Sequence, residues 1–508
     1  MSSAPFFPKF NRAGLGRKPA SAQAILARKT RLTDSYCLDH LEQLFGGHLP
    51  SKVRNFKPEK GRNSRKRIFT PMLTYWAMLA QVLAPDTSCA SAVSRVQALY
   101  VSEGLAAISS DTGAYCKARA RLSIFFLFEI LHWISAAVVR AADDFGSDSS
   151  PITCGRLLVM DGTSATLPDS KANREIYSYP SGQKEGCGFP KMYLLGLFHL
   201  RSGASLRMVK SATLRHDSAL AWKLLPWLRK GDTLLADRAF CSYTFIHACE
   251  KLGVTVVMRL HQARKNEPGK SKRLGPGDEL QTWQKPTKCP KGTTAAQFEA
   301  LPAKLDIRVV CHQVEVRGHR PEPMYIATTK RDVGMDSAAS IVALYLLRWK
   351  VELFFDDLKT SQSMETLRCE SPHMLARELI MQLIAYNLVR MTMVQAEKQR
   401  PAAQEGSLSY KGTLTRITEW HTALWACQGA KKRQERYMEL LRCVAEDVVP
   451  SRPGRREPRQ IKRRSSKYPL MTKPRAEARL LPEPPKHSPK KSQKSKKVTK
   501  LLTEKKAA

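Results

Sequence analysis

The sequence predicts an α/β protein with a mixed-sheet core, an all-helical domain before it, and helices and a basic tail after it. Three observations favour this arrangement. Short apolar runs typical of buried strands alternate with helical patterns between about residues 156 and 260. Apolar residues at helical spacing dominate residues 69–142 and 369–449. From Ser451 the chain is rich in Pro, Lys, Arg and Ser, which favours disorder.

The charge of the chain predicts a polyanionic partner. The 508 residues carry a formal net charge of +39, far more than solubility requires. The last 58 residues hold 20 Lys/Arg and 4 Asp/Glu, or +16, which leaves +23 for the rest, so the body of the protein is itself basic. Ribosomal, membrane-surface and nucleic-acid-binding proteins share this trait. Charge alone therefore indicates the class of partner and not the activity.

Cysteine usage and hydropathy predict a cytoplasmic protein without a membrane span. The 12 cysteines show no Cys-x-x-Cys or Cys/His spacing, which disfavours structural zinc. The start, MSSAPFFPKFNRAGLGRK, lacks the apolar segment of a signal peptide, so reduced thiols are expected. The longest apolar stretches, around 122–139 and 379–394, carry polar residues such as Glu129 and Arg390, which indicates buried helices.

The N-terminal part is expected to be helical after a basic beginning. Residues 1–68 are basic and punctuated by Pro and Gly, with one helix expected at about 34–45. Three helical patterns follow, at about 71–84, 89–104 and 110–142, and they form a predicted N-terminal domain, residues 69–142. This domain is either a helical cap on the core or a module that recognises DNA ends. The sequence does not separate the two.

The core is expected to begin after a linker at 142–155. A buried strand, 156–160, ends in Asp161, and another, 232–236, runs into Asp237 and Arg238. Open α/β sheets place their chemistry at such strand ends. For Asp161 alone, an Asp-Gly turn is the simpler interpretation. The remaining elements are a hairpin with strands 192–200 and 205–212, helices at 216–228 and 242–253, and a strand at 254–260.

Residues 261–330 interrupt this pattern. Gly, Pro and Lys dominate the first part, and strand-like runs follow. We expect a β-rich insertion that is separate from the main sheet. Its one tryptophan, Trp283, is either a DNA contact or a core aromatic of the insertion.

Most of residues 337–366 is expected to form one helix with two stripes. The apolar stripe comprises Leu344, Leu347, Val351, Phe354 and Leu358, and a polar stripe beside it comprises Tyr345, Arg348, Glu352 and Lys359. Alone, Arg348 and Glu352 are most simply an ordinary solvated salt bridge at i,i+4 spacing. Asp356 and Asp357 are expected at the helix surface.

Together, these features predict a metal site. Carboxylates from two strand ends and one helix, Asp161, Asp237 and Glu352, can hold two divalent ions about 3.5–4 Å apart. Oxygen ligands favour Mg²⁺, with Mn²⁺ as a substitute. Arg348 and Lys359 would bind phosphates, and Tyr345 would hydrogen-bond a phosphate or stack.

The motifs resemble those of a known family. DGT at Asp161, DR at Asp237-Arg238, and Tyr345-x2-Arg348-x3-Glu352-x6-Lys359 are similar to the catalytic blocks of bacterial DDE transposases of the insertion-sequence-4 family. The resemblance covers about residues 155–368. It implies an RNase H-like core with the triad Asp161, Asp237 and Glu352. It further implies a dimer that binds terminal inverted repeats in double-stranded DNA, cuts there and joins the 3′-ends to target DNA, in the cytoplasm in association with the nucleoid. The expected DNA contacts are Tyr345, Arg348, Lys359, Arg238, Lys184, Lys191 and Trp283.

Two alternatives stay open. A structure-selective nuclease on the same scaffold would carry the same triad but cleave without joining. A domesticated, non-catalytic DNA-binding protein would be expected to have lost a carboxylate, and all three are present. Beyond the core, residues 369–449 are expected to be helical, with a long helix at 373–399. The tail, residues 450–508, is either a solvated extension or a non-specific contact to the DNA backbone.

Overall fold

The computed structural model describes residues 67–102, 104–144, 155–180, 186–212, 217–264, 271–290, 293–314, 322–400, 406–425, 430–449, 471–474 and 477. The chain forms two units, residues 1–178 with 190–457, and residues 179–189 with 458–508. In the second unit, Gly186 has a φ of +74° and lies against Pro474. The predicted helix at 34–45, Lys184 and most of the predicted tail lie outside the described residues. The elements below belong to the first unit.

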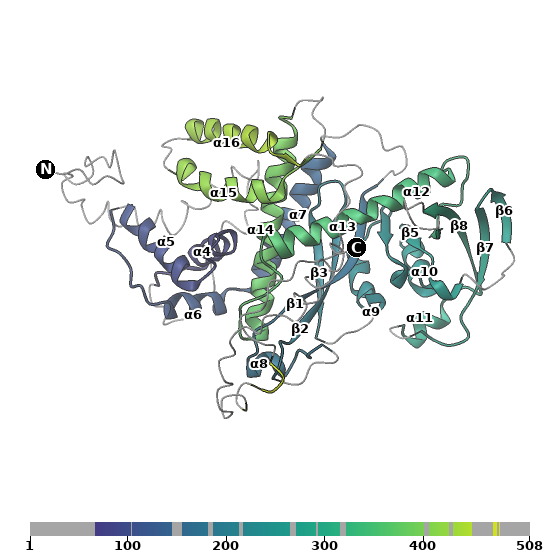
Figure 1. The fold of residues 1–508 in the computed structure, drawn as a ribbon, viewed down its shortest axis with the longest axis horizontal. Coiled ribbons are helices and arrows are strands. Elements are labelled where there is room, and N and C mark those ends of the chain that lie inside the picture. The colour runs from purple at the N-terminus through teal and green to yellow at the C-terminus, as the bar shows by residue number, and fades with distance from the viewer. Residues whose placement is uncertain are drawn as a thin grey trace, which may run out of the picture. The chain divides into compact units, whose positions relative to one another are not determined.

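The first unit is built on a nine-stranded mixed sheet (Figure 1), which confirms the predicted α/β class. The strand order is β3-β2-β1-β4-β5-β9-β8-β7-β6. Strands β1, β4 and β5 are parallel neighbours, and the other paired strands run antiparallel. The strands are β1 Leu157–Thr166, β2 Lys191–His199, β3 Ser205–Ser211, β4 Thr233–Ala236, β5 Thr255–Arg259, β6 Ser271–Gly275, β7 Asp278–Gln284, β8 Lys304–Val314 and β9 Glu322–Thr328.

The segment at 261–330 is β-rich, as predicted, but the expectation that it stands apart from the sheet is wrong. Strand β9 pairs antiparallel with β5, with Met258 opposite Ala327, and β8, β7 and β6 follow outward. Without β9, the buried strand β5 would present an unpaired edge, which sheet proteins avoid. The segment therefore extends the sheet that carries the candidate site.

The hairpin β2–β3 forms as predicted. Gly203 in its turn has a φ of +70°, a conformation that favours glycine, and a Cβ there would meet the side chains of Arg390 and Phe354. The predicted helix at 216–228 is in part different. It is α9 Asp217–Ala221 followed by a 3₁₀-helix, Trp222–Trp227, which contains Pro226. The other elements of the sheet region are α8 Lys171–Arg174, α10 Tyr243–Lys251 and α11 Ala295–Glu299.

The N-terminal helices are α4 Pro71–Leu83, α5 Cys89–Ser102, α6 Gly113–Arg121 and α7 Ile124–Asp143. The pattern at 110–142 thus forms two helices and not one. Ser123 interrupts it because its side chain accepts a hydrogen bond from Phe126 N and caps α7. By length and composition α7 is apolar enough to cross a membrane, with half of the apolar window buried inside the protein. In the protein α7 packs against α14 and β3.

The long helix α14, Pro372–Glu397, joins the helices to the sheet. It packs against α4, α7, α15 and α16 (Figure 1). The buried Asn387 accepts a hydrogen bond from Ser205 N and donates one to Ser205 O. The hydroxyl of Tyr386 donates to Gly203 O. These bonds fasten α14 to the β2–β3 hairpin, so a helix near the end of the core fixes the edge of the sheet.

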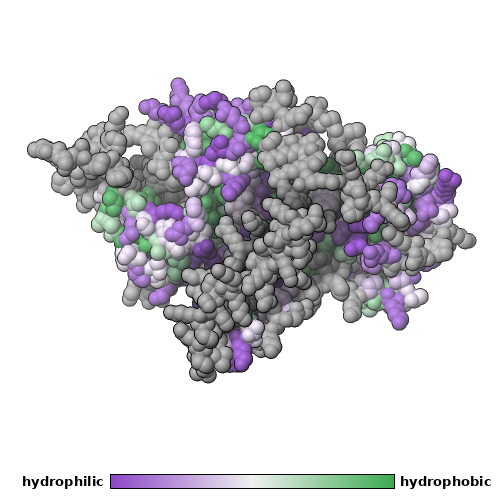
Figure 2. All heavy atoms as spheres, viewed as in Figure 1, coloured by the Kyte–Doolittle hydropathy of each residue, from purple (hydrophilic) through white to green (hydrophobic). Residues whose placement is uncertain are grey.

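One or two helices were expected in residues 407–449, and two follow α14. They are α15 Tyr410–Trp425 and α16 Ala430–Ala445, with the short strands β10 Ser407–Leu408 and β11 Val448–Val449 pairing at their ends. Figure 2 shows hydrophilic side chains over α16. Leu440, Leu441 and Val444 on its other side are buried. The helix is therefore amphipathic and covers the core with one face.

The segment at 337–366 is helical but not one regular helix. It comprises α12 Ala338–Leu346, a 3₁₀-turn Leu347–Trp349, α13 Lys350–Asp356 and a π-helical turn Asp357–Ser361. Four residues of the predicted apolar stripe are buried, namely Leu344, Val351, Phe354 and Leu358. Leu347 is 37% exposed, so its assignment to that stripe is wrong.

Candidate active site

The candidate site begins at one edge of the three parallel strands. Met160 of β1 is in register with Ala236 of β4, which is in register with Met258 of β5. The residues that follow these three are Asp161, Asp237 and Arg259. Parallel register therefore brings two carboxylates and a guanidinium to adjacent positions.

The strand that carries Asp161 is longer than predicted. It was expected to end at Met160, but β1 continues to Thr166, and Asp161 pairs with Gly196 of β2. Pairing with β4 does end at Met160, because β4 ends at Ala236. Asp161 thus lies where β1 loses its parallel neighbour, and the antiparallel β2 still holds its backbone. The position is more rigid than a strand end.

Arg348 links the sheet edge to the helical segment. Its Nη1 donates to Asp161 Oδ2 at 3.1 Å, and its Nη2 donates to Glu352 Oε1 at 3.4 Å. Burial alone would lower the pKa of Arg348, but nearby Tyr345 and the carboxylates, Asp237 among them, outweigh burial and raise that pKa above its usual value. One guanidinium thus joins Asp161 to Glu352, and the charge of Asp237 acts on the same guanidinium. Their catalytic role stays a prediction.

The guanidinium of Arg348 is buried and incompletely hydrogen-bonded. Arg348 Nε has no hydrogen-bond partner among the described residues. A simple solvated salt bridge was the alternative interpretation of Arg348 and Glu352. The contact with Asp161, 187 residues away in sequence, and the buried Nε both argue against it.

Tyr345 is only 3% exposed, and burial raises its pKa to about 12. Arg348 forms a hydrogen bond with the side chain of Tyr345, and its positive charge acts to lower the same pKa. A buried ring has no free face for a base, so the geometry does not favour the stacking role considered from the sequence. Tyr345 instead contacts Arg348 through a side-chain hydrogen bond.

The other members of the polar stripe are more accessible. The side chain of Glu352 is 50% exposed, and Lys359 is half-buried in the π-helical turn. Arg238 and Lys191 are half-buried, at the start of a 3₁₀-turn and at the start of β2. Their proposed contacts to DNA stay predictions.

Asp357 was expected at the helix surface, and this is wrong. Its Oδ2 accepts a hydrogen bond from Arg390 Nη2 at 2.5 Å, and its side chain is 20% exposed. Burial raises the pKa of Asp357 to about 6, although Arg390 opposes the shift. The guanidinium of Arg390 also lies over the rings of Phe354 and Tyr386. Asp356, in contrast, is exposed as predicted and accepts a hydrogen bond from Thr360.

Trp283 is a buried residue of β7. It is 5% exposed, its Nε1 donates to Gln281 at 3.0 Å, and the guanidinium of Arg264 lies 4.1 Å from its ring centroid. This environment favours the core-aromatic interpretation over contact with DNA.

Two residues near the site were missed from the sequence. Arg259 follows Met258 of β5 as Asp237 follows Ala236 of β4, and this equivalent position was a signal that could have identified Arg259. Trp349 is 58% exposed and lies in the Tyr-Arg-Glu-Lys block itself, with the Arg348 guanidinium 5.4 Å from its ring centroid. Leu346 and Leu353 beside it are also exposed. An exposed apolar group of this kind next to polar residues indicates a binding surface.

The residue types fit a divalent cation, with Arg348 as a competitor. In the part of the chain that the structure describes, no three His, Cys, Asp or Glu side chains lie close enough to hold a metal ion as they stand. A guanidinium lies between Asp161 and Glu352 where a cation would neutralise the same charges. Carboxylate oxygens suit Mg²⁺ and Mn²⁺. The donors are thus suitable, and Arg348 would have to move for a cation to bind between them.

Comparison with known proteins defines the class of enzyme. Residues 152–388, which include all three predicted carboxylates, match the family model described as transposase DDE domain. Such domains generally use divalent metal ions. Over 334 residues the chain is 24% identical to the transposase InsG for insertion sequence element IS4 of Escherichia coli (strain K12), covering 64% of this chain and 71% of that protein. These two matches support a DDE-type transposase, and the enzyme class is DNA transposase. A cryo-EM structure of a piggyBac transposase synaptic complex with hairpin DNA aligns with a TM-score of 0.39 and 12% identity, over 85% of this chain and 86% of that one.

Proposed function

We propose that this chain is an insertion-sequence-4-type transposase that cleaves DNA at the terminal inverted repeats of its element and joins the 3′-ends to target DNA. The proposal includes an RNase H-like arrangement of the core and a triad of Asp161, Asp237 and Glu352. The observation that carries it is the bridge from Arg348 to both Asp161 and Glu352, beside Asp237. A structural salt bridge does not require acidic residues on two adjacent strands and a helix.

Asp161, Asp237 and Glu352 would hold two Mg²⁺ ions, and the chemistry that such ions would supply is activation of a water or 3′-hydroxyl and stabilisation of the leaving oxygen of a phosphodiester. The pairing of β1 with β2 holds the backbone of Asp161, and Asp237 directly follows β4, so these two carboxylates would need little reorganisation. Glu352 is half-exposed on a helix and can adjust. Without substrate, Arg348 bridges Asp161 and Glu352 and offsets the repulsion between their charges. If a cation took its place, Arg348 would be free to bind a phosphate.

The DNA partner follows from charge and from the enzyme class. The net charge of +39 attracts a polyanion. Lys359 and Arg238 would contact backbone phosphates, and the exposed Trp349 would contact the DNA strand next to Glu352. The terminal repeats, the homodimer on paired ends and a backbone-binding role for the basic tail belong to this proposal as well.

The proposal is tested with Glu352→Gln, which keeps the shape of the side chain and removes its charge. The substrate is linear DNA with the terminal repeat of the element, assayed with Mg²⁺ for nicking and for joining to a plasmid. Glu439→Gln is the matched control, since Glu439 is also 50% exposed and also pairs with an arginine, Arg442, on its own helix. We expect the control to nick and join, and Glu352→Gln to bind DNA but do neither.

The outcomes separate the alternatives. If the wild type cleaves without joining, the chain is a structure-selective nuclease. If the wild type and both variants bind DNA and none reacts with Mg²⁺ or Mn²⁺, the chain is a non-catalytic DNA-binding protein. If Glu352→Gln nicks and joins like the control, Glu352 does not belong to the catalytic group.

A further inference from the structure

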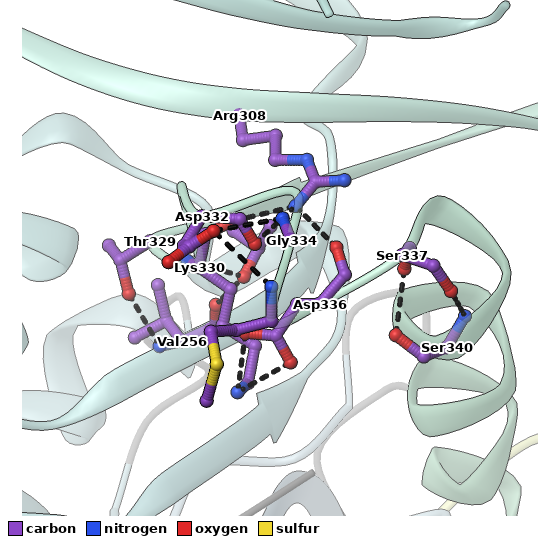
Figure 3. A network of polar contacts seen from close by, with 11 residues as sticks. Val256, Arg308, Thr329, Lys330, Asp332, Gly334, Asp336, Ser337 and Ser340 are labelled. Atoms are coloured by element: carbon purple, nitrogen blue, oxygen red, sulfur yellow. Dashed lines mark hydrogen bonds and ion pairs between the residues drawn. The ribbon is translucent and has the colours of Figure 1, made fainter. Parts of the chain in front are cut away.

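A buried arginine outside the proposed triad holds the loop that leads into the Glu352 segment. This β9–α12 loop, residues 330–336, connects β9 with the N-cap of α12, Ser337. Arg308 of β8 is 0% exposed and points into the loop (Figure 3). Its Nη1 lies 3.2 Å from Lys330 O, 3.4 Å from Asp332 O and 2.7 Å from Asp336 O. One side chain thus contacts carbonyls at the beginning, middle and end of the loop.

The guanidinium of Arg308 is itself fixed from the other side. Its Nε donates to Asp278 Oδ1 at 2.9 Å, and its Nη2 donates to Asp278 Oδ2 at 2.6 Å. Asp278 begins β7 and is 4% exposed. Such a two-point contact determines the plane of the guanidinium. Nη1 is therefore held at the loop and cannot rotate away.

The loop is also closed on itself. Lys330 Nζ donates to both carboxylate oxygens of Asp336, at 2.9 and 3.1 Å. Asp332 Oδ1 accepts hydrogen bonds from Gly334 N and Met335 N (Figure 3). The Ser337 side chain then caps α12 by accepting from Ser340 N. The start of α12 is therefore fixed through Asp336, whose carbonyl makes the shortest of the three bonds from Arg308.

Hydrogen bonds fix the position of α12 along its axis, which apolar packing alone does not. Ile341 and Leu344 are buried, and α12 contacts β5, β8 and β9, so the hydrophobic effect sets the depth of the helix. That effect is non-directional and resists sliding along the helix axis only weakly. Hydrogen bonds to three carbonyls define a position along the axis. A buried ion pair adds little net stability over an apolar pair, so its main consequence here is geometric.

We propose that Arg308 is a positioning residue for the active site, acting through the β9–α12 loop on the placement of Tyr345, Arg348 and Glu352. The effect on cleavage rests on the proposed function, whereas the anchoring of α12 by Arg308 does not. This anchoring means that the β-rich segment holds the Glu352 helix in place over the carboxylates of the parallel strands.

The test replaces the ion pair and compares it with a matched pair elsewhere in the sheet. The test variant is Arg308→Met with Asp278→Leu, which removes both charges and so avoids an unpaired buried carboxylate. The control is Arg156→Met with Asp232→Leu. Arg156 also donates through Nε and Nη2 to one buried aspartate, at 2.9 and 2.7 Å, and to a carbonyl, but at the opposite end of β1 and β4. The intermediate variant, Arg308→Lys, keeps the charge without the planar fork.

The first readout is amide hydrogen exchange and needs no activity. We expect the amides of α12 to exchange about tenfold faster or more in the test variant, relative to those of α14, and to be unchanged in the control. The second readout is Mg²⁺-dependent cleavage of terminal-repeat DNA. We expect a loss of about tenfold to hundredfold in the test variant, the effect of a small misplacement of catalytic groups, with DNA affinity unchanged without metal. Arg308→Lys should lie between wild type and the test variant in both.

Three results would overturn the inference: unchanged exchange in α12, faster exchange with full cleavage, or equal loss of cleavage in test and control. If the test variant does not fold, Arg308→Lys carries both measurements with the same criteria. If the wild type itself does not cleave, the proposed function is wrong, and the exchange experiment still decides whether Arg308 anchors α12.

Discussion

Replacing Arg348 with Met should make the protein less stable without metal and more responsive to Mg²⁺. The change removes the cation between Asp161 and Glu352. The side chains of Arg348 and Asp161 are 10% and 25% exposed, so this pair lies between a surface pair, at most about 1 kcal/mol, and a buried one, about 3–5 kcal/mol when broken. The pair with Glu352 is half-exposed and contributes little after solvent screening. We therefore expect a loss of about 2 kcal/mol.

Metal should restore this loss. A ligand that binds only the folded state stabilises it by about 2.7 kcal/mol at a hundred times its dissociation constant. In the wild type, Mg²⁺ has to displace Arg348, whereas in the variant it meets two carboxylates without a counter-ion. The increase in unfolding free energy from EDTA to Mg²⁺ should therefore be larger for Arg348→Met than for the wild type.

The assay is urea unfolding, followed by fluorescence or circular dichroism, in EDTA and at increasing Mg²⁺. Arg156→Met is the control, because it breaks an arginine–aspartate pair at the other end of β1, whose side chains are 16% and 3% exposed. It should lose stability that Mg²⁺ does not restore. An equal Mg²⁺ response in Arg348→Met and the wild type would show that Arg348 does not occupy the place of a cation.

Three further predictions concern pH, packing and DNA contact. Burial lowers the pKa of His199 to about 4, so its folded state binds fewer protons than the unfolded state, and stability falls by about 3 kcal/mol as pH drops from 6.5 to 4. His199→Gln should lack this loss in urea unfolding at pH 7 and 4.5. The raised pKa of Asp357 acts in the opposite direction, because it lowers stability as pH rises from 4 to 6, and Asp357→Asn should remove that loss. Phe198→Ala should cost about 3–5 kcal/mol in the same assay, because the buried ring packs against Phe354, Phe355 and Tyr386. Trp349→Ala should change stability by less than about 0.5 kcal/mol but weaken binding to terminal-repeat DNA in a titration, and equal affinity would remove Trp349 from the DNA surface.

The parallel strands and their carboxylates could be predicted from the sequence because both signals are local. An apolar run such as 234–236 has no polar face, which indicates a strand buried on both sides. The residue that follows such a run lies at the sheet edge. This reasoning led to Asp237 directly, and to Asp161 although β1 continues beyond it. The continuation of β1 beyond Met160 was not visible because most of the added residues, Gly162 to Ser164 among them, are only half-buried, and their partners lie in β2, later in the sequence.

The contacts made over long sequence distances could not be predicted. Asp357 looks like a surface residue beside Asp356, and its burial depends on Arg390, 33 residues later. Likewise, nothing within 322–328 indicates that β9 pairs with β5, since both are ordinary strand patterns. Arg308 shows the same limit, because its partners lie 30 residues before it and 22–28 residues after it. Local periodicity carries no information about such pairs.

The irregular winding of the Glu352 segment explains why its two stripes were only partly correct. A 3₁₀-turn rotates about 120° per residue and an α-helix about 100°, so the three residues Leu347–Trp349 shift the helix phase by about 60°. With regular spacing, Leu347 would lie on the buried stripe and Arg348 on the open one. The shift exposes Leu347 and Trp349 and turns Arg348 toward Asp161. The turn is held between two anchored ends, Arg308 at the loop before α12 and the Asp357–Arg390 pair after α13. Release of either end would allow the segment to relax toward a regular helix, which would separate Arg348 from Asp161 and shift Glu352 with it, although all three carboxylates would still be present.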